Sequence, residues 1–301
     1  CAVSAWPVPG AEGGCRLRCF LRSCPRPVMD CCSVESIKGF SSLTAETKAE
    51  ERLAARTPYV EPRTRAAEAL LQGITEDVIR RIENGTLAEF APSVARNEIR
   101  RNREEVREYL RETYREVGRR FASDTQSRIE ERTGQQAQQS AGDQWTEALG
   151  DLFVAGVVAG IVAAILAQLQ SNILAVIGAA QDDGLGIDGI VSRLEDRMGE
   201  RNEQQAALVA RTAITTASNR ADLFAARRFP ATLRKQWVDS DDDRVRLSHE
   251  VVDGNESNLD EPFVWFSPNS GQRVRAQHPG DPQLPLPDLL NCRCIMIFVP
   301  A

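Results

Sequence analysis

The chain has 301 residues, a hydrophobic fraction of 42%, and 37 basic against 43 acidic side chains, which gives a formal net charge of −6. A hydrophobic fraction near the globular average excludes a fully disordered chain, a collagen-like chain and a small disulfide-framework protein. The negative balance excludes a chain-wide basic surface for nucleic acid, so any contact with DNA has to come from a local patch.

The first 40 residues are rich in cysteine, proline and arginine and show no hydrophobic periodicity. Six of the eight cysteines lie there: Cys1, Cys15, Cys19, Cys24, Cys31 and Cys32. Their spacing matches no paired C-x₂-C framework, so we expect residues 1–40 to be disordered. We interpret residues 1–28 as an over-extended reading frame, with translation starting at Met29. The alternatives are a metal knuckle, a disulfide knot or a lipidated Cys1.

Residues 41–140 form the first predicted helical region, because this segment is polar, charged and almost free of β-branched runs. From Arg103 to Arg119 an arginine recurs every fourth residue, and from Arg107 onward each arginine has a glutamate three residues before it. Such pairs predict a long solvated helix. The alternative is that the row of arginines binds DNA, but the neighbouring carboxylates would cancel most of its positive electrostatic potential. The apolar residues of this stretch form a narrow stripe that suits a partner helix: Ile99, Val106, Leu110, Val117 and Phe121.

A second helical region is predicted at residues 143–226. Within it, residues 152–180 carry no charge, and a helix needs only ~20 such residues to cross a bilayer. Gly156 and Gly160 form a G-x-x-x-G motif, which is typical of closely packed membrane helices. Polar residues in the second half of the segment disfavour insertion, so we expect a buried or oligomer-packing helix, with a membrane-active segment as the alternative.

Residues 227–301 are predicted to form a compact α+β module, because prolines and β-forming residues become frequent there. Residues 263–266 read as a short strand, and residues 292–299 as a final buried strand. The predicted fold class is therefore mainly α, with long helices in residues 45–225 and a small mixed sheet in residues 230–301.

The module contains an ordered set of short motifs: a tryptophan, a D-R-x-R-x-x-H sequence, a D-G pair, a P-G-D turn and an N-C-x-C sequence. The residues of this set are Trp237, Asp243, Arg244, Arg246, His249, Asp253, Gly254, Pro279, Gly280, Asp281, Asn291, Cys292 and Cys294. In order and spacing the set resembles the Mu F-like head morphogenesis (minor capsid) proteins of tailed phages, over about residues 205–300. One departure is Ala213, where the family often has glutamate.

The resemblance implies a portal-associated minor head protein that acts in head morphogenesis and DNA packaging. It implies a place in the phage head, and in the host cytoplasm during assembly. The expected partners are the portal and major capsid proteins, with weak contact with packaged DNA and self-association through helices as further expectations. Some relatives leave the head with the genome, so an ejected protein whose residues 152–180 act at the host membrane is the alternative.

The module also holds both histidines of the chain, together with a C-x-C pair. His249, His278, Cys292 and Cys294 offer two imidazoles and two thiolates, a donor set that suits a structural tetrahedral Zn²⁺ site. C-x-C is a less common zinc spacing than C-x₂₋₄-C. The alternatives are cysteines that pack as small hydrophobic residues, and a His249 that is hydrogen-bonded to a neighbouring aspartate, Asp253 or Asp243.

A small nuclease-like enzyme is a further alternative, with His249 as general base, Asp243 or Asp253 orienting it, and Arg246 binding an anion. The chain has no nucleophile motif, no Gly-rich phosphate loop and no H-E-x-x-H sequence. We therefore predict a protein that is not an enzyme, with no catalytic residues and no cofactor other than the candidate zinc.

Overall fold

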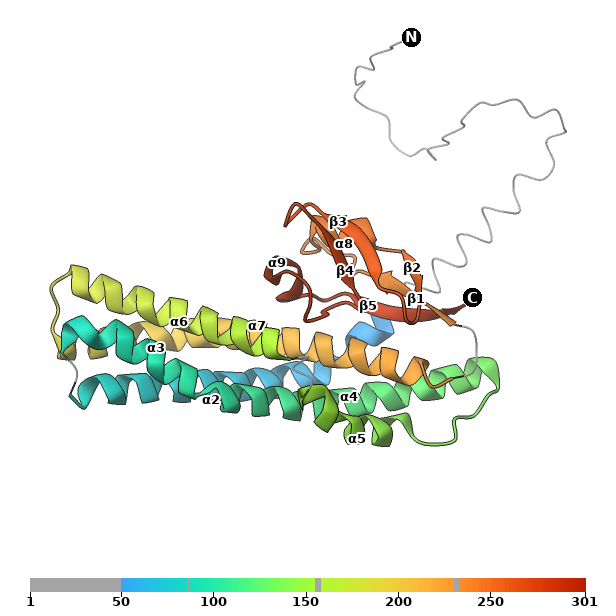
Figure 1. Ribbon diagram of the computed structural model, residues 1–301, viewed down its shortest axis with the longest axis horizontal. Coiled ribbons are helices and arrows are strands. Elements are labelled where there is room, and N and C mark those ends of the chain that lie inside the picture. Colours follow the sequence, from blue (N-terminus) through green and yellow to red (C-terminus); the bar gives the residue numbers. More distant parts are fainter. Residues whose placement is uncertain (1–49, 86, 155–157, 230–232) are drawn as a thin grey trace, which may run out of the picture. The chain divides into compact units, whose positions relative to one another are not determined.

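A computed structural model of the chain describes residues 50–85, 87–154, 158–229 and 233–301, except for the side chains of residues 152–154. The described residues between 50 and 301 belong to one compact unit (Figure 1). The predictions for residues 1–40, for a start at Met29 and for Gly156 fall outside the described residues.

The first part of this unit is built from helices that pack side by side (Figure 1). They are α2 (Thr57–Glu83), the 3₁₀ turn η1 (Ala88–Phe90), α3 (Ala91–Arg101), α4 (Arg103–Thr133), α5 (Ala141–Val154), α6 (Ala159–Asp182) and α7 (Ile187–Ala226). The 40-residue α7 packs against α2, α4, α5 and α6, so it is the helix around which the others are arranged.

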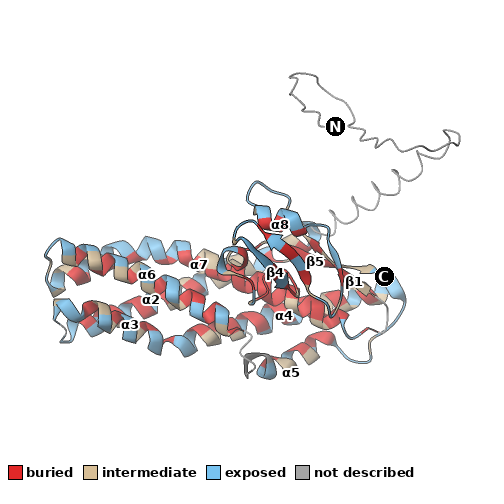
Figure 2. Ribbon diagram, turned by 45° about the horizontal axis from the view of Figure 1, so that its top comes forward, coloured by how far each residue is buried: buried red, intermediate tan, exposed pale blue. Residues whose placement is uncertain are grey.

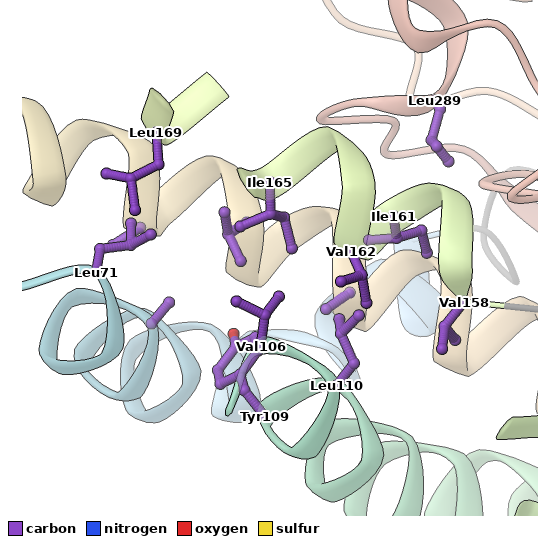
Figure 3. Packing of buried hydrophobic residues seen from close by; sticks show 14 of the residues in the cluster. Leu71, Val106, Tyr109, Leu110, Val158, Ile161, Val162, Ile165, Leu169 and Leu289 are labelled. Atoms are coloured by element: carbon purple, nitrogen blue, oxygen red, sulfur yellow. The ribbon is translucent and has the colours of Figure 1, made fainter. Parts of the chain in front are cut away.

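Apolar side chains at helical spacing form the core between these helices. On α6, Ile161, Ile165 and Leu169 lie four residues apart and are buried. Leu71 of α2 lies beside Leu169, and Leu110 of α4 lies beside Val162 (Figure 3). Buried residues accordingly follow the inner faces of the helices and exposed residues their outer faces (Figure 2). Burial of each such side chain contributes about 2 kcal/mol to the free energy of folding, so these apolar stripes stabilise the bundle.

The predicted charged helix is confirmed in α4. Glu104 pairs with Arg107 at 3.7 Å, and Glu108 pairs with Arg111, in both cases three residues apart on the solvent side. The predicted apolar stripe is buried throughout. One detail differs: Ile99 belongs to α3, because the backbone leaves the helical conformation at Asn102, between α3 and α4.

The uncharged segment at residues 152–180 covers the end of α5 and most of α6, apart from residues 155–157, which are not described. Among the described residues, α6 is long and apolar enough to cross a membrane by length and composition, and 44% of its most apolar stretch is buried. The helix packs against α3, α4 and α7. Its exposed side carries small uncharged residues at every fourth position: Ala163, Ala167, Ser171, Ala175 and Ala179.

The C-terminal module contains two small sheets and two short helices. Its elements are β1 (Leu233–Val238), α8 (Leu247–Val252), β2 (Glu256–Asn258), β3 (Phe263–Ser267), β4 (Gln272–Ala276), α9 (Leu286–Leu289) and β5 (Ile295–Pro300). One sheet has the order β2-β1-β5, and the other is the hairpin β3-β4. The predicted fold class, mainly α with a C-terminal α+β module, is confirmed.

The strand pairing differs from the predicted mixed sheet, because all three strand pairs are antiparallel. Between β3 and β4 a short turn ending at Gly271 reverses the chain, and a connection of that length cannot join parallel strands. On the inner side of the module Trp237 of β1 faces Trp265 of β3, with ring centroids 5.3 Å apart, and Phe263 packs against the same indole. These aromatic side chains form the core of the module.

Candidate metal centre

Three of the four predicted metal-ligating residues come together in the module. Nδ1 of His249 lies 3.2 Å from Sγ of Cys294 and 3.8 Å from Sγ of Cys292. All three donor atoms lie within 4.8 Å of one another, and all three side chains are buried. His278 is not part of this group. The cluster therefore has one imidazole and two thiols.

α8 positions His249. This short helix packs on β3, and its buried side consists of Ser248, His249 and Val252. The imidazole lies against the indole of Trp237, with ring centroids 5.7 Å apart in an edge-on arrangement. Nδ1 faces both sulfurs, so it is the nitrogen placed for coordination with them. Nε2 is buried without a hydrogen-bond partner among the described residues.

The backbone around the C-x-C pair is held by side chains from the helical bundle. Thr215 of α7 donates to the carbonyl of Cys292 at 2.7 Å, and Asn219 donates to that of Cys294 at 3.1 Å. Nη1 of the buried Arg56 lies 3.2 Å from the carbonyl oxygen of Arg293 and 3.3 Å from that of Cys294. Hydrogen bonds of this kind fix the direction of both thiols before anything binds between them.

A left-handed residue leads into this segment. Asn291 has a φ of 56°, a conformation that asparagine adopts more readily than most residues, and its N–H donates to Oγ1 of Thr212. The turn directs the chain from α9 into the C-x-C pair along α7. The N-C-x-C motif is therefore a turn followed by two inward-facing thiols.

The thiols and the imidazole influence one another electrostatically. The hydrogen bond from Cys294 is the largest cause that holds the pKa of Cys292 well below its usual value, and His249 acts in the same direction. Burial raises the pKa of Cys294. For His249, burial alone would lower the pKa, but the hydrogen bond and charge of Cys292 raise it above its usual value. One thiolate beside the imidazole is thus favoured, and a thiolate is the form of cysteine that binds metals.

His278 has a structural position in the P-G-D turn. Its Nδ1 lies 3.0 Å from the carbonyl of Pro279, and burial lowers its pKa to about 4. The carboxylate of Asp281 accepts from the N–H groups of Gln277 and Gln283 and so closes the turn. Gly280 has a φ of 73°, and a Cβ there would lie 3.1 Å from Thr215, so glycine lets the turn approach α7.

Several other family-motif residues also support turns. Asp253 accepts from the N–H of Asp239 at 2.8 Å, and Gly254, with a φ of 70°, donates to the carbonyl of Trp237. Arg246 donates to the carbonyl of Leu290, and the N–H of Arg244 donates to Asp242. These contacts join the ends of β1, α8 and α9.

The arrangement expected for a nuclease-like centre is not assembled. His249 is 2% exposed and faces two sulfurs, whereas Asp253 and Arg246 bind backbone groups elsewhere. A general base has to reach the proton that it removes, and this imidazole is enclosed. The other alternative, a hydrogen bond between His249 and the carboxylate of Asp253 or Asp243, is likewise replaced by contacts with the thiols, and Asp243 is exposed.

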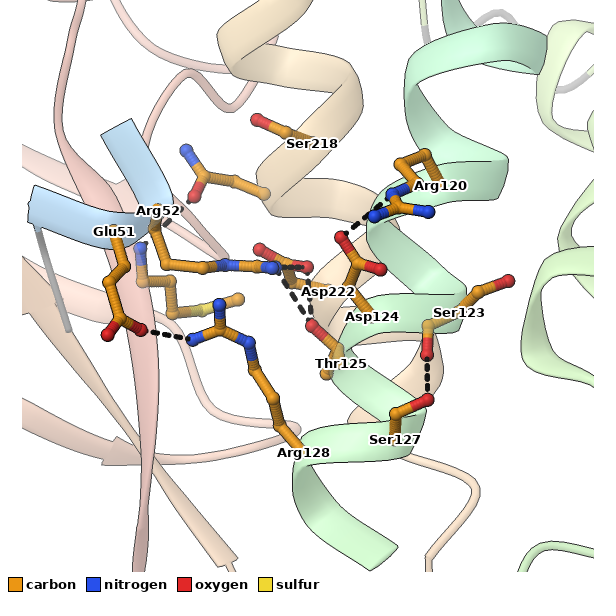
Figure 4. Close-up of polar contacts among 12 residues, drawn as sticks. Glu51, Arg52, Arg120, Ser123, Asp124, Thr125, Ser127, Arg128, Ser218 and Asp222 are labelled. Carbon is orange, nitrogen blue, oxygen red and sulfur yellow. Dashed lines mark hydrogen bonds and ion pairs between the residues drawn. The ribbon is translucent and has the colours of Figure 1, made fainter. Parts of the chain in front are cut away.

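Two buried polar clusters are not predicted by the sequence. In the bundle, Arg52 forms an ion pair with Asp222 of α7, and Thr125 of α4 donates to the same carboxylate at 2.6 Å (Figure 4). In the module, Asp288 of α9 accepts from Ser248 at 2.6 Å and from Ser267 at 3.0 Å. Their members are far apart in sequence, so no local pattern could have revealed them.

Comparison with known proteins identifies part of the chain. Residues 171–297 match the family described as Phage Mu protein F like protein, which is a head morphogenesis (minor capsid) family. No curated protein and no solved structure matches the chain. The domain begins within α6 and includes all of α7, so it starts earlier than the predicted residue 205. Members of this family are generally structural rather than enzymatic.

Proposed function

We propose that this chain, whose residues 171–297 form a Mu F-like domain, is a minor head protein that acts beside the portal in head morphogenesis and DNA packaging. The observation that carries the proposal is the family match, which spans the whole motif set from Trp237 to Cys294. The family match supports a location in the phage head, and it supports other head components as partners.

The roles of the motif residues agree with an assembly protein. They close turns and fix the module on α7, and His249, Cys292 and Cys294 are buried. The helices before residue 171 lie outside the family match, yet they pack on α7, the long helix of the domain. We therefore propose that the domain carries the function shared with the family, and that the preceding helices supply contacts particular to this head.

A null mutant of the phage that encodes this chain tests the proposal. We expect such a mutant to yield few DNA-filled, infectious heads, and expression of the wild-type chain from a plasmid should restore them. Electron microscopy of the particles and nuclease protection of packaged DNA provide the readouts. Normal numbers of filled, infectious heads from the uncomplemented mutant would remove the proposal.

Copy number tests the association with the portal. Quantitative mass spectrometry of purified particles should find this protein in amounts comparable to the portal protein and far below the major capsid protein. Cross-linking of procapsids should join it to the portal. An amount comparable to the major capsid protein would contradict a minor head protein. The same spectra would show whether peptides upstream of Met29 are present.

The second candidate function is ejection with the genome, followed by action of residues 152–180 at the host membrane. It is favoured by α6, which is long and apolar enough to span a bilayer and which carries no charge before its last residue, Asp182. Flotation of the purified protein with liposomes tests it. Ala167→Glu offers a matched variant, because Ala167 is exposed and the change adds a charge to that side of α6. Flotation of wild type but not of the variant would support this candidate, and flotation of neither would remove it.

A further inference from the structure

We propose that His249, Cys292 and Cys294 bind one zinc ion through Nδ1 and the two Sγ atoms. This site is independent of the proposed role in the head, because it rests on the arrangement of three side chains and not on the family. It differs from the four-ligand site expected from the sequence, since His278 lies in a turn of its own and is not a ligand.

The spacing of the three donor atoms suits a tetrahedral ion. Zinc lies about 2.3 Å from thiolate sulfur and about 2.0–2.1 Å from imidazole nitrogen, so two such ligands at a tetrahedral angle are about 3.6 Å apart. The observed separations between Nδ1 and the two sulfurs, 3.2 and 3.8 Å, lie on either side of this value. Small rotations of both cysteine side chains would therefore make both distances suitable for the ion.

The charges favour a thiophilic divalent ion. Two thiolates and one divalent cation sum to zero, so a loaded site would bury no net charge. Sulfur and imidazole are ligands that select zinc and related ions, whereas calcium and magnesium require oxygen. Among the described residues, both hydrogen-bond contacts of His249 Nδ1 are with sulfur. Cysteines that only packed as small hydrophobic residues would be better placed beside an apolar group than beside this polar nitrogen.

The surroundings hold the ligands in place. Arg56, Thr215 and Asn219 bind the carbonyls of residues 292–294, and Trp237 packs on the His249 ring. Three protein ligands leave a fourth coordination position, which water occupies in zinc sites with three protein ligands. The ion would join α8 to the segment before β5, and so stabilise the attachment of the module to α7.

The six cysteines near the beginning of the chain have to be removed from the test, because they could bind metal themselves. In a full-length chain with these six replaced by serine, Cys292 and Cys294 are the only thiols. We expect this protein, purified without chelators, to contain about one zinc per chain by elemental mass spectrometry. After replacement of zinc by cobalt, its absorption spectrum should show sulfur-to-cobalt charge transfer and the visible bands of a tetrahedral ion.

Two variants define the ligands. In the same background, Cys292→Ala with Cys294→Ala should reduce the zinc content at least about tenfold and abolish the cobalt bands. His278→Gln is the matched control, because it removes the other histidine of the module and should keep the zinc. Loss of zinc from a folded His278→Gln protein would overturn the three-ligand site. Circular dichroism checks that each variant is folded.

A third variant keeps the test valid if the double alanine variant does not fold. His249→Cys replaces one zinc ligand by another, so it should retain the ion and shift the cobalt bands toward those of a three-thiolate site. Removal of zinc from the parent protein by a chelator should lower its Tm by at least about 5 °C, and added zinc should restore it. A parent protein without zinc, whose Tm responds to neither treatment and which shows no sulfur-to-cobalt band, would overturn the proposal.

Discussion

The helical bundle and the C-terminal module are stabilised in different ways. In the bundle, stripes of apolar side chains from α2, α4, α6 and α7 make one extended core, and most of its charges remain on the surface in pairs between helix neighbours. In the module, a few aromatic side chains form a small core, and side-chain hydrogen bonds to backbone groups hold turns and strands in place. The bundle thus depends on a repeated pattern, whereas the module depends on particular contacts.

Asp222 offers the strongest test, because it is a buried charge in a bundle that otherwise relies on apolar packing. Asp222→Asn would leave Arg52 buried without its counter-ion, and we expect a loss of about 3–5 kcal/mol in the free energy of unfolding. Urea unfolding measures it. The control is Asp143→Asn, which breaks the exposed pair with Arg119 and should cost less than about 1 kcal/mol. Equal losses of unfolding free energy in the two variants would show that burial does not increase the contribution of an ion pair to stability.

Asn219 tests how far the two regions depend on each other. Its side chain donates to the carbonyls of Pro279 and Cys294 and accepts from the N–H of Met296, so it joins α7 to three points of the module. Asn219→Ala would remove three buried hydrogen bonds, and we expect a loss of about 3 kcal/mol in the free energy of unfolding. Hydrogen exchange should show the loss of protection mainly in β5 and the turn at Pro279. A uniform loss across α2 and α4 would instead mean that the regions unfold as one.

The buried His278 predicts a pH dependence that belongs to the module. Burial lowers its pKa to about 4, whereas an unfolded histidine titrates near 6.5. Between these values the unfolded chain binds a proton that the folded chain does not. The free energy of unfolding is therefore highest above about pH 6.5 and falls as the pH decreases toward about 4. At pH 5 the loss should be about 2 kcal/mol relative to pH 7.

His278→Gln provides the control for this pH effect. The variant lacks the titrating group, so its unfolding free energy should change less between pH 7 and pH 5 than that of the wild type. Because carboxylates are common to both proteins, the difference between the two pH profiles isolates the histidine. Identical profiles would contradict a buried neutral His278.

Gly118 tests the packing of the bundle at one point. The indole of Trp145 covers this glycine of α4 and donates from Nε1 to the carbonyl of Tyr114, and a Cβ at Gly118 would lie 2.6 Å from Cζ2 of the indole. Gly118→Ala should therefore destabilise the protein by about 1–2 kcal/mol, although alanine favours helices.

Gly199 is the matched control for Gly118. It lies within α7, and a Cβ there would meet no atom within 4 Å, so Gly199→Ala should stabilise the protein by up to about 1 kcal/mol. Thermal unfolding of the two variants should move in opposite directions. Shifts of the same sign would show that contact with Trp145 does not decide the effect at Gly118.

Local patterns in the chain predicted much of this architecture. The glutamate and arginine spacing of α4, its apolar stripe and the change to strands after residue 227 could be read directly, because helices and strands place side chains at fixed periods. It could also be predicted that His249, Cys292 and Cys294 lie in the same module, since the two cysteines are two residues apart and the chain has only two histidines.

Long-range contacts could not be predicted in this way. Nothing in the sequence near Arg52 or Arg56 indicates that Asp222 or the carbonyls of Arg293 and Cys294 will meet them, because the partners are brought together by the packing of α7. The chemistry of its side chain alone groups His278 with the other candidate metal ligands. In the structure the turn at Gly280 docks on α7 and holds His278 there.

The sequence by itself therefore determined the helices, the start of the module and the resemblance carried by its motif set, because each of these is encoded in neighbouring residues. The antiparallel pairing of β1 with β5, the attachment of the module to α7 and the choice of one histidine for the thiol cluster were decided only by tertiary structure. Each of these joins residues far apart in the chain, and such contacts depend on the three-dimensional fit of the elements and not on their local spacing.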